Sequence, residues 1–164
     1  YINNNSSLQC ITLTCNEANI SNNIFDNCIS TTSGFCSVTN NTTNLNINNN
    51  IMKNIKTNKL IVFRGGNLNF TNNQVDLSKY YCNFISLWDK VPETLKINNN
   101  TVSNLTGVLL QVPSLIDNFT CNYLSINNNL IYDCNSQSST LIYIVPTTLG
   151  NIKIFELKGN SLGM

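Results

Sequence analysis

The chain contains no histidine, a single arginine and a single tryptophan. Without histidine it lacks the commonest general base and every nucleophile pair of the Ser-His or Cys-His type. Histidine is also a frequent zinc ligand, and the cysteines form no C-x-x-C pair, so the sequence does not predict a metal site. We therefore expect no cofactor, no catalytic residues and no enzymatic activity.

Charged side chains are scarce as well, at 10% of the 164 residues, and the formal net charge is +1. A surface for nucleic acid or for an anionic membrane needs clustered Lys and Arg, whereas here the lysines are scattered and Arg64 stands alone. The longest wholly apolar runs, such as 141–145, are too short to cross a bilayer. We expect neither a nucleic-acid partner nor membrane insertion.

Asparagine is abundant instead, at 34 of the 164 residues, and much of it falls in a repeat. The pattern apolar-x-apolar-x-x-Asn-x-apolar occurs six times, and residues 95–102 are one copy. A repeat has to be recognised before any local pattern is interpreted. The second apolar residue of each copy, its anchor, is Ile20, Ile47, Phe70, Ile97, Ile126 or Leu157, at spacings of 27, 23, 27, 29 and 31. Three residues after the anchors stand Asn23, Asn50, Asn73, Asn100, Asn129 and Asn160.

Each copy predicts a strand, a tight bend and a second strand. In residues 124–126 the apolar side chains alternate with Ser125, which places the two kinds on opposite faces of a strand. Asn tolerates the left-handed backbone conformation that a tight bend requires, and Gly159 replaces the first Asn of the last copy. A third strand is predicted after a variable loop, at 60–63, 84–87, 107–110 and 141–144.

Three short strands in about 27 residues describe one coil of a solenoid, whose stacked coils share a core that a single coil cannot bury. We predict an all-β fold, a single-stranded parallel β-helix of about six coils with an Asn ladder at one corner. Residues 1–164 form one domain, with 1–17 as an amino-terminal arm and partial coil and 18–164 as the repeats. An antiparallel β-sandwich is the alternative, although it would not require the same Asn six times.

The repeat Leu-x-Ile-x-x-Asn-x-Val resembles the right-handed parallel β-helix repeat of the pectate-lyase-like superfamily, over roughly residues 18–164. This resemblance implies three parallel sheets and a stacked Asn corner. Polysaccharide lyases and hydrolases of that class carry clustered acids on one sheet face, together with Arg, Lys or His. The outward strand positions here hold almost no acids, so we expect a non-catalytic member of the surface or adhesin type.

One loop offers a candidate ligand site. Trp88, Asp89 and Glu93 share it, and an aromatic face beside carboxylates suits a carbohydrate. The alternative interpretation is a solvated loop with Trp88 packed against the body of the protein. Ice binding is a further alternative for a regular β-helix face, but it calls for a repeated Thr-x-Thr, and the outward columns here are mixed and mostly Asn.

Nine Asn-x-Ser/Thr sequons occur, a number that means little in so Asn-rich a chain, so their position is the better guide. Outward strand positions and loops suit a glycan in a secreted protein. The glycosylation candidates are Asn19, Asn40, Asn41, Asn69, Asn99, Asn104 and Asn118.

The seven cysteines allow two interpretations. They serve as small buried hydrophobes in the interior columns, or some of them form disulfides in an extracellular protein. Cys10 and Cys36 are the pair expected on neighbouring coils, and therefore the candidate disulfide. Since seven is odd, at least one thiol stays free or bonds to another chain.

The sequence therefore predicts an extracellular or cell-surface structural or adhesive rod, glycosylated and able to form an end-to-end filament. Open strand edges at the ends of a solenoid are templates for further strands, so either more coils follow in the full-length protein or another subunit stacks there. The Asn-rich amino terminus is an exchange strand or a disordered tail, and self-association is the expected partner interaction. A chain that begins at Tyr1 is expected to be a processed or truncated product. The alternative function is a carbohydrate-binding or polysaccharide-cleaving β-helix.

Overall fold

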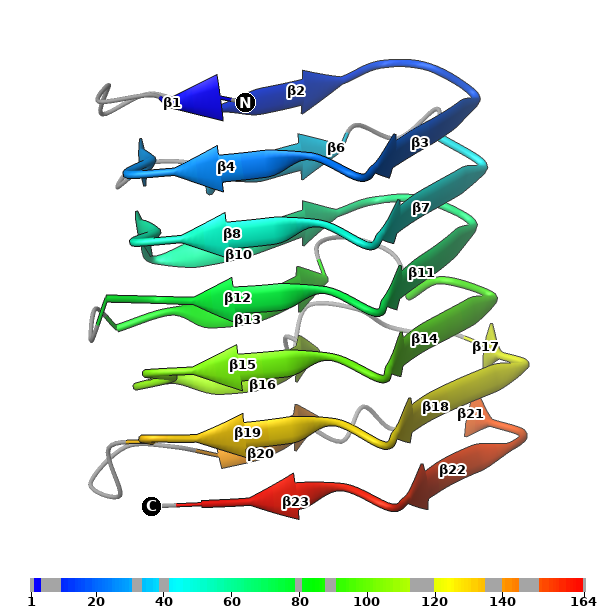
Figure 1. Ribbon diagram of the computed structural model, residues 1–164. Helices are drawn as coiled ribbons and strands as arrows, with labels where there is room; N and C mark the ends of the chain where they lie inside the picture. The colour runs from blue at the N-terminus through cyan, green and yellow to red at the C-terminus, as the bar shows by residue number, and fades with distance from the viewer. Residues whose placement is uncertain are drawn as a thin grey trace.

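The computed structural model describes residues 2–3, 10–30, 34–38, 42–78, 81–87, 91–112, 120–134, 140–144 and 151–163. Within these ranges all regular structure is β-strand, and the strands wind into coils that stack in chain order along one axis (Figure 1). Every strand pair is parallel, and successive coils are about 27 residues apart. The predicted parallel β-solenoid is confirmed.

Three sheets run the length of the stack. The first sheet holds β3 (Glu17–Ser21), β7 (Asn44–Asn48), β11 (Asn67–Thr71), β14 (Thr94–Asn98), β18 (Tyr123–Asn127) and β22 (Phe155–Lys158). The second sheet holds β1 (Ile2–Asn3), β4 (Ile24–Asp26), β8 (Ile51–Lys53), β12 (Gln74–Asp76), β15 (Thr101–Ser103), β19 (Leu130–Tyr132) and β23 (Ser161–Leu162). Each coil contributes one strand to each sheet in turn.

The third sheet holds the third strand of each coil. Its members are β2 (Ile11–Leu13), β6 (Cys36–Val38), β10 (Lys59–Phe63), β13 (Asn83–Leu87), β16 (Val108–Val112) and β20 (Thr140–Ile144). Two small pairs complete the strands, β5 (Ile29–Ser30) with β9 (Lys56–Thr57) and β17 (Thr120–Cys121) with β21 (Asn151–Ile152). The predicted third strands are confirmed.

The predicted count of about six coils includes the two ends of the stack. Six strands form the first sheet, but only β7, β11, β14 and β18 are paired on both sides within it. About four turns therefore lie inside the stack, with an incompletely covered coil above and below them.

The corner between the first and second sheets is two residues long in every coil. Between β14 and β15, for example, it consists of Asn99 and Asn100. The first of the two has a positive φ, 57° at Asn99 and 63° at Gly159. An L side chain other than Asn or Asp is uncommon in this conformation, and Gly adopts it freely. The first Asn therefore makes the bend and leaves the second for the ladder.

The ladder asparagines bond in one direction, each to the next coil. Asn73 donates both its backbone N–H and its Nδ2 to Oδ1 of Asn100, at 2.9 and 3.2 Å. Asn100 repeats this towards Asn129, at 3.0 Å for both bonds, and its Nδ2 also donates to the carbonyl of Phe70 at 3.0 Å. Because every amide is paired, these side chains can be buried without the usual cost of a buried polar group. The predicted ladder is confirmed at all six positions, from Asn23 to Asn160.

A second left-handed corner follows the second sheet, and the sequence analysis did not identify it. Its positive φ angles fall at Asn27, Asn54, Ser78, Asn104 and Asp133. The side chains brace neighbouring coils, since Nδ2 of Asn104 donates to Oδ1 of Asp76 at 2.7 Å. Three residue types share this corner, so no single-letter column marks it in the sequence.

The core runs through the centre of the coils and is filled by the anchor columns and their neighbours. Phe70 and Phe84 pack edge to face there, with ring centroids 5.1 Å apart. Third-sheet strands such as β10 and β13 are buried on both faces, whereas first-sheet strands alternate buried and partly exposed residues. The first sheet therefore presents the regular polar face of the rod.

None of the seven cysteines forms a disulfide, and four of them are buried, as expected of small hydrophobes. Cys10 and Cys36 do lie on neighbouring coils, but the predicted disulfide is not formed. The register partner of Cys36 is Ile11, so Cys10 is displaced by one residue from the position opposite it. Burial, with a smaller effect of the nearby Cys10, raises the pKa of Cys36 to about 12, which keeps this thiol protonated and unreactive.

Candidate functional site

The outward face of the first sheet carries three columns of polar side chains in strict register. The first column is Glu17, Asn44, Asn67, Thr94 and Tyr123. The second is Asn19, Asn46, Asn69, Lys96, Ser125 and Glu156, and the third is Ser21, Asn48, Thr71, Asn98, Asn127 and Lys158. The sequence predicted the second and third columns as outward, and it missed the first.

The amino-terminal half of this face consists mostly of amide side chains that bond one another, with Glu17 as its acid. Asn67 donates its Nδ2 to Oδ1 of Asn44 at 2.9 Å, and Asn69 donates to Asn46 at 2.7 Å. Asn44 in turn donates to Oε1 of Glu17 at 3.0 Å. These amides bond one another between coils and form an ordered array, in which Oδ1 of Asn69 is buried without a partner.

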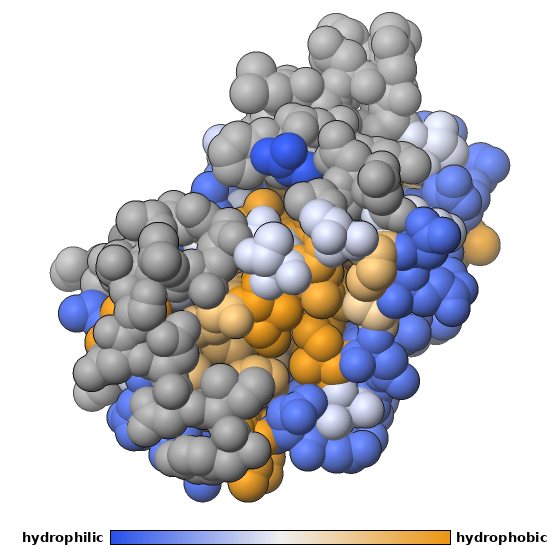
Figure 2. Space-filling model, turned by 90° about the horizontal axis from the view of Figure 1, so that it is seen from above, coloured by the Kyte–Doolittle hydropathy of each residue, from blue (hydrophilic) through white to orange (hydrophobic). Residues whose placement is uncertain are grey.

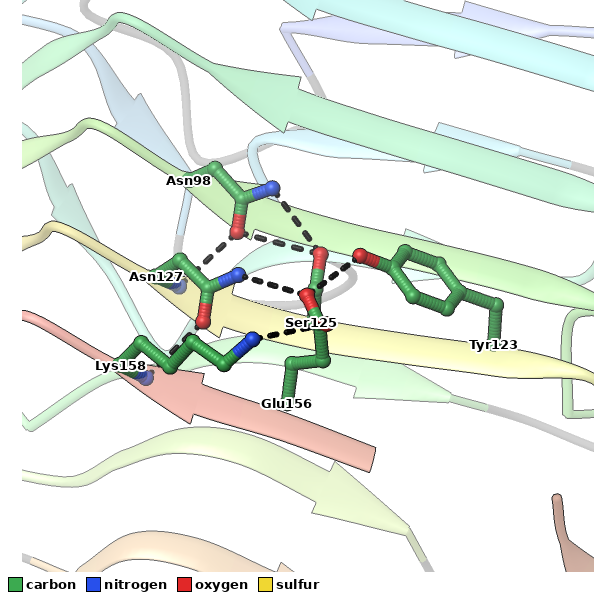
Figure 3. A network of polar contacts seen from close by, with 6 residues as sticks. All are labelled: Asn98, Tyr123, Ser125, Asn127, Glu156 and Lys158. Atoms are coloured by element: carbon green, nitrogen blue, oxygen red, sulfur yellow. Dashed lines mark hydrogen bonds and ion pairs between the residues drawn. The ribbon is translucent and has the colours of Figure 1, made fainter. Parts of the chain in front are cut away.

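The carboxyl-terminal half is different, because charged and aromatic side chains replace the amides (Figure 3). The hydroxyl of Tyr123 donates to Oε2 of Glu156 at 2.7 Å, and Nδ2 of Asn127 donates to the same oxygen at 3.2 Å. Nζ of Lys158 lies 3.0 Å from Oε1 of Glu156. We call Tyr123, Ser125, Asn127, Glu156 and Lys158, together with Lys96 and Asn98, the polar network.

Two further contacts complete the polar network. Nζ of Lys96 lies 5.7 Å from the centroid of the Tyr123 ring, within the range of a cation–π interaction. Ser125 is fully buried although its strand position faces outward, and Asn98 donates its Nδ2 to the Ser125 hydroxyl at 2.9 Å. The sequence did not predict the contact between Tyr123 and Glu156, because 33 residues separate them.

The electrostatics of the polar network keep Glu156 ionised. The hydrogen bond from Tyr123, then those from Lys158 and Asn127, lower the pKa of its carboxyl group. The hydrogen bond to Glu156 raises the pKa of Tyr123, because the phenol proton is held by the carboxylate. A carboxylate with a lowered pKa is poorly suited to act as a general acid. The polar network can offer hydrogen bonds and ammonium groups to a polar ligand, but it does not resemble a proton-transfer site.

The variant Tyr123→Phe is expected to raise the pKa of Glu156 towards that of an ordinary carboxyl group, because it removes the largest cause of the lowering. Since the folded pKa is lowered, the stabilisation that it brings is present above the unfolded pKa and is lost as pH falls through the folded pKa. Carboxyl NMR titration measures the shift. Thr94→Val, in the same column but two coils from Glu156, is the matched control, and equal pKa values in both variants would contradict the assignment.

The predicted ligand loop is only partly described by the structure. Trp88 and Asp89 lie outside the described residues. Glu93 is exposed and directly precedes β14, and its carbonyl accepts hydrogen bonds from the backbone N–H of Asn122 at 2.8 Å and of Tyr123 at 3.2 Å. Glu93 therefore stands one coil from Tyr123, at the edge of the polar network. Among the described residues no group of His, Cys, Asp and Glu could hold a metal ion.

The sequon asparagines differ in exposure and in hydrogen bonding. Asn40, Asn41 and Asn118 lie outside the described residues. Asn19 and Asn69 face outward as predicted, but Nδ2 of Asn69 is held by Asn46 at 2.7 Å, and Nδ2 of Asn104 is held by Asp76 at the same distance. Asn99 stands exposed at its left-handed corner, with its backbone N–H bonded to the carbonyl of Asn127. Asn99 and Asn19, which is exposed as well, are the best-presented glycan acceptors among the four described candidates.

The two ends of the stack expose core columns. At the carboxyl-terminal end Phe155, Leu157 and Leu162 are 49%, 50% and 60% exposed, against 2%, 0% and 1% for their equivalents one coil earlier, Leu124, Ile126 and Ile131. At the amino-terminal end Ala18 and Ile20 are partly exposed, and apolar surface is visible at the centre of that face (Figure 2). Each end thus offers apolar columns and the edges of parallel strands.

Comparison of the chain with protein-family models, with curated proteins and with solved structures gave no match. In the part of the chain that the structure describes, no helix is long and apolar enough to cross a membrane.

Proposed function

We propose that the chain is a non-enzymatic structural or adhesive rod at the cell surface or outside the cell, built into an end-to-end filament. Its parallel coils and Asn corner support a place among non-catalytic right-handed β-helices of the pectate-lyase-like kind. The bonded amide face and the ionised Glu156 favour a scaffold over a reaction centre. A glycan at Asn99 fits the same picture, because this Asn is exposed at a corner.

The observation that carries the proposal is the exposure of core columns on the last described coil. Phe155, Leu157 and Leu162 belong to core columns, yet about half of each side chain or more is exposed. Large apolar side chains gathered on a flat end with unpaired strand edges are a template for another coil. A further coil, from a second copy or from the same chain where it continues, would bury them as their equivalents inside the rod are buried.

End-to-end assembly is expected to depend on Leu157. The variant Leu157→Asp should abolish or strongly weaken it, because a carboxylate in the joint would lose its water without gaining a partner. Leu130→Asp is the matched control, since Leu130 is 45% exposed but lies on the side of the rod, on β19. Sedimentation velocity and electron microscopy report the assembly. Discrete monomers of the parent chain at all concentrations would count against the proposal.

The glycan is tested on material isolated from its natural source. The intact mass is expected to fall after glycosidase treatment, and Asn99→Gln should remove one glycan. Asn69→Gln should remove none, because the Asn69 amide is engaged with Asn46. An unmodified mass in native material would remove this part of the proposal.

A carbohydrate-binding protein is the second candidate function. It is supported by the polar network, where a tyrosine, two lysines and a carboxylate lie together on a flat face, with Glu93 at the edge. Such groups suit the hydroxyl and acidic groups of a saccharide. The raised pKa of Tyr123 and the lowered pKa of Glu156 favour binding over cleavage.

A further inference from the structure

The corner between the first and second sheets carries a glycosylation sequon in one coil. Five of these corners begin with an Asn of positive φ, and Asn99 is one of them. A sequon needs Ser or Thr two residues later, and Thr101 takes that position after Asn99. At the other four corners the same position holds Ile24, Ile51, Gln74 and Leu130. Among these corner residues, only Asn99 is therefore a glycan acceptor.

The polar network begins in the same coil. Lys96 and Asn98 of β14 are its first members, and Asn98 directly precedes Asn99 in the chain. The network continues on β18 and β22, whereas the three preceding coils carry mostly amides on this face. Within the described part of the first sheet, the corner sequon and the cluster of charged and aromatic side chains thus coincide.

The amide of the corner residue can reach the outward face of the first sheet. Two coils before Asn99, Nδ2 of Asn49 donates to Oδ1 of Asn48 at 3.2 Å. Asn48 faces outward in the same column as Asn98. A glycan is attached through Nδ2, so a glycan on Asn99 can start beside Asn98, at the edge of the polar network.

The following coils lie within reach of the first sugars. The backbone N–H of Asn99 donates to the carbonyl of Asn127 at 2.9 Å, which places the next coil directly beside the corner. Asn127 and Lys158 continue the column of Asn98. Since neighbouring parallel strands are about 4.8 Å apart, Lys158 stands about 10 Å from Asn98 across the sheet. The core of a glycan on Asn99 is long enough to extend over this distance.

The polar network has hydrogen-bonding capacity left for a sugar. An ionised carboxylate accepts about four hydrogen bonds, and Glu156 receives three, from Tyr123, Asn127 and Lys158. The Lys158 ammonium has three donors, of which one is directed to Glu156, and its side chain is 70% exposed. Sugar hydroxyls both donate and accept, and the acetamido group of N-acetylglucosamine adds an N–H and a carbonyl. The network therefore complements the sugars that begin an N-linked glycan.

Attachment to the chain makes a weak contact sufficient. Saccharides and other small ligands are usually held in concave sites, whereas the polar network lies on a flat face and would hold a free sugar poorly. A ligand joined by a short flexible linker is present at an effective concentration on the order of millimolar. A tethered glycan therefore occupies such a face more readily than an external saccharide does.

We propose that the glycan on Asn99 docks on the polar network of its own chain, with its first N-acetylglucosamine units over Asn98, Asn127 and the Glu156–Lys158 pair. The inference rests on the glycan at Asn99 proposed above and identifies the ligand of the network. A docked glycan covers the charged part of the first sheet and closes it to external saccharides.

The test measures how fast an endoglycosidase cuts the Asn99 glycan on the folded, full-length chain. A docked glycan is cut only when it is released, so docking for about nine-tenths of the time predicts about tenfold slower cleavage. Glu156→Ala and Lys158→Ala should each raise the rate at Asn99. Asn48→Ala, in the column of Lys158 but two coils before Asn99, is the matched control and should leave the rate unchanged. Glycopeptide mass spectrometry measures the rate, and circular dichroism verifies the fold.

A second measurement reports the contact directly. Nuclear Overhauser effects are expected between the acetamido methyl group of the first sugars and the side chain of Lys158. They should be absent from Thr101→Ala, which removes the sequon and keeps Asn99 at the corner. Ser21→Ala removes the sequon of Asn19, three coils away on the same sheet, and should leave these signals unchanged.

The outcomes separate this inference from the proposed function. Cleavage rates at Asn99 that neither network variant changes, or a glycosylated chain without these Overhauser effects, would overturn the docking while leaving the glycan in place. Native material without a glycan on Asn99 would overturn both the docking and the proposed glycan.

Discussion

Replacing Asn100 by alanine is expected to lower the free energy of unfolding by about 2–6 kcal/mol, because each buried polar group left without a partner costs about 1–3 kcal/mol. Oδ1 of Asn100 accepts two hydrogen bonds from Asn73, at 2.9 and 3.2 Å. In the variant the backbone N–H of Asn73 would lose its partner, whereas Nδ2 keeps the carbonyls of Ile47 and Thr71. The carbonyl of Phe70 would lose a donor as well. Urea denaturation followed by circular dichroism measures the change.

The matched control for this substitution is Asn48→Ala. Asn48 lies on the outward face, where its Nδ2 donates to Asn19 at 3.4 Å and its Oδ1 accepts from Asn49 at 3.2 Å, and both contacts are exposed to solvent. Surface substitutions of this kind change the free energy of unfolding by about 0.5 kcal/mol or less. Equal losses in the two variants would show that the buried ladder contributes no more than a surface amide.

Truncating Phe70 to alanine is expected to cost about 3–5 kcal/mol, since removing a buried ring leaves a cavity that the surrounding coils cannot fill. Phe70 is fully buried and packs edge to face on Phe84 of the third sheet, at 5.1 Å. The same denaturation measurement applies. A cost close to that of an exposed truncation would mean that the coils around Phe70 collapse onto the vacated space.

The rod provides an internal control for this variant in the same column. Leu157 is the anchor of the last coil and is 50% exposed, so Leu157→Ala is expected to cost only about 1 kcal/mol. The measurement has to be made at concentrations where the chain is monomeric, because assembly would bury this residue and raise the cost. A loss equal to that of Phe70→Ala would contradict the exposed position of the last anchor.

The repeated columns made the core and the ladder predictable. A position that is apolar or Asn in every coil reflects the same contact made repeatedly, so the sequence itself indicates the stacking partner, as for Ile97 and Ile126. The third strands were predictable for a similar reason, and 141–144 corresponds to β20 (Thr140–Ile144). Coil stacking turns one-dimensional periodicity directly into three-dimensional contacts.

Features that do not repeat could not be predicted from the sequence. The second corner has its positive φ at an Asn or Asp directly after the strand in four coils and one residue later, at Ser78, in another, because several residues tolerate a positive φ when their side chains bond locally. The polar network depends on Tyr123, Glu156 and Lys158, each of which occurs once in its column. The sequence also could not decide whether Cys10 and Cys36 form a disulfide. A shift of one residue in strand register is enough to prevent the bond, and Cys36 is paired with Ile11.

The constant corner has a consequence for the loops. Successive ladder residues are separated by as few as 23 and as many as 31 residues, yet the first corner always takes two. All variation in length therefore falls in the segments that follow the second and third strands, on other sides of the rod. A peptide inserted at one of these segments would alter the surface of a single coil without shifting the register of any other. The fold is suited to gaining new surface features one coil at a time.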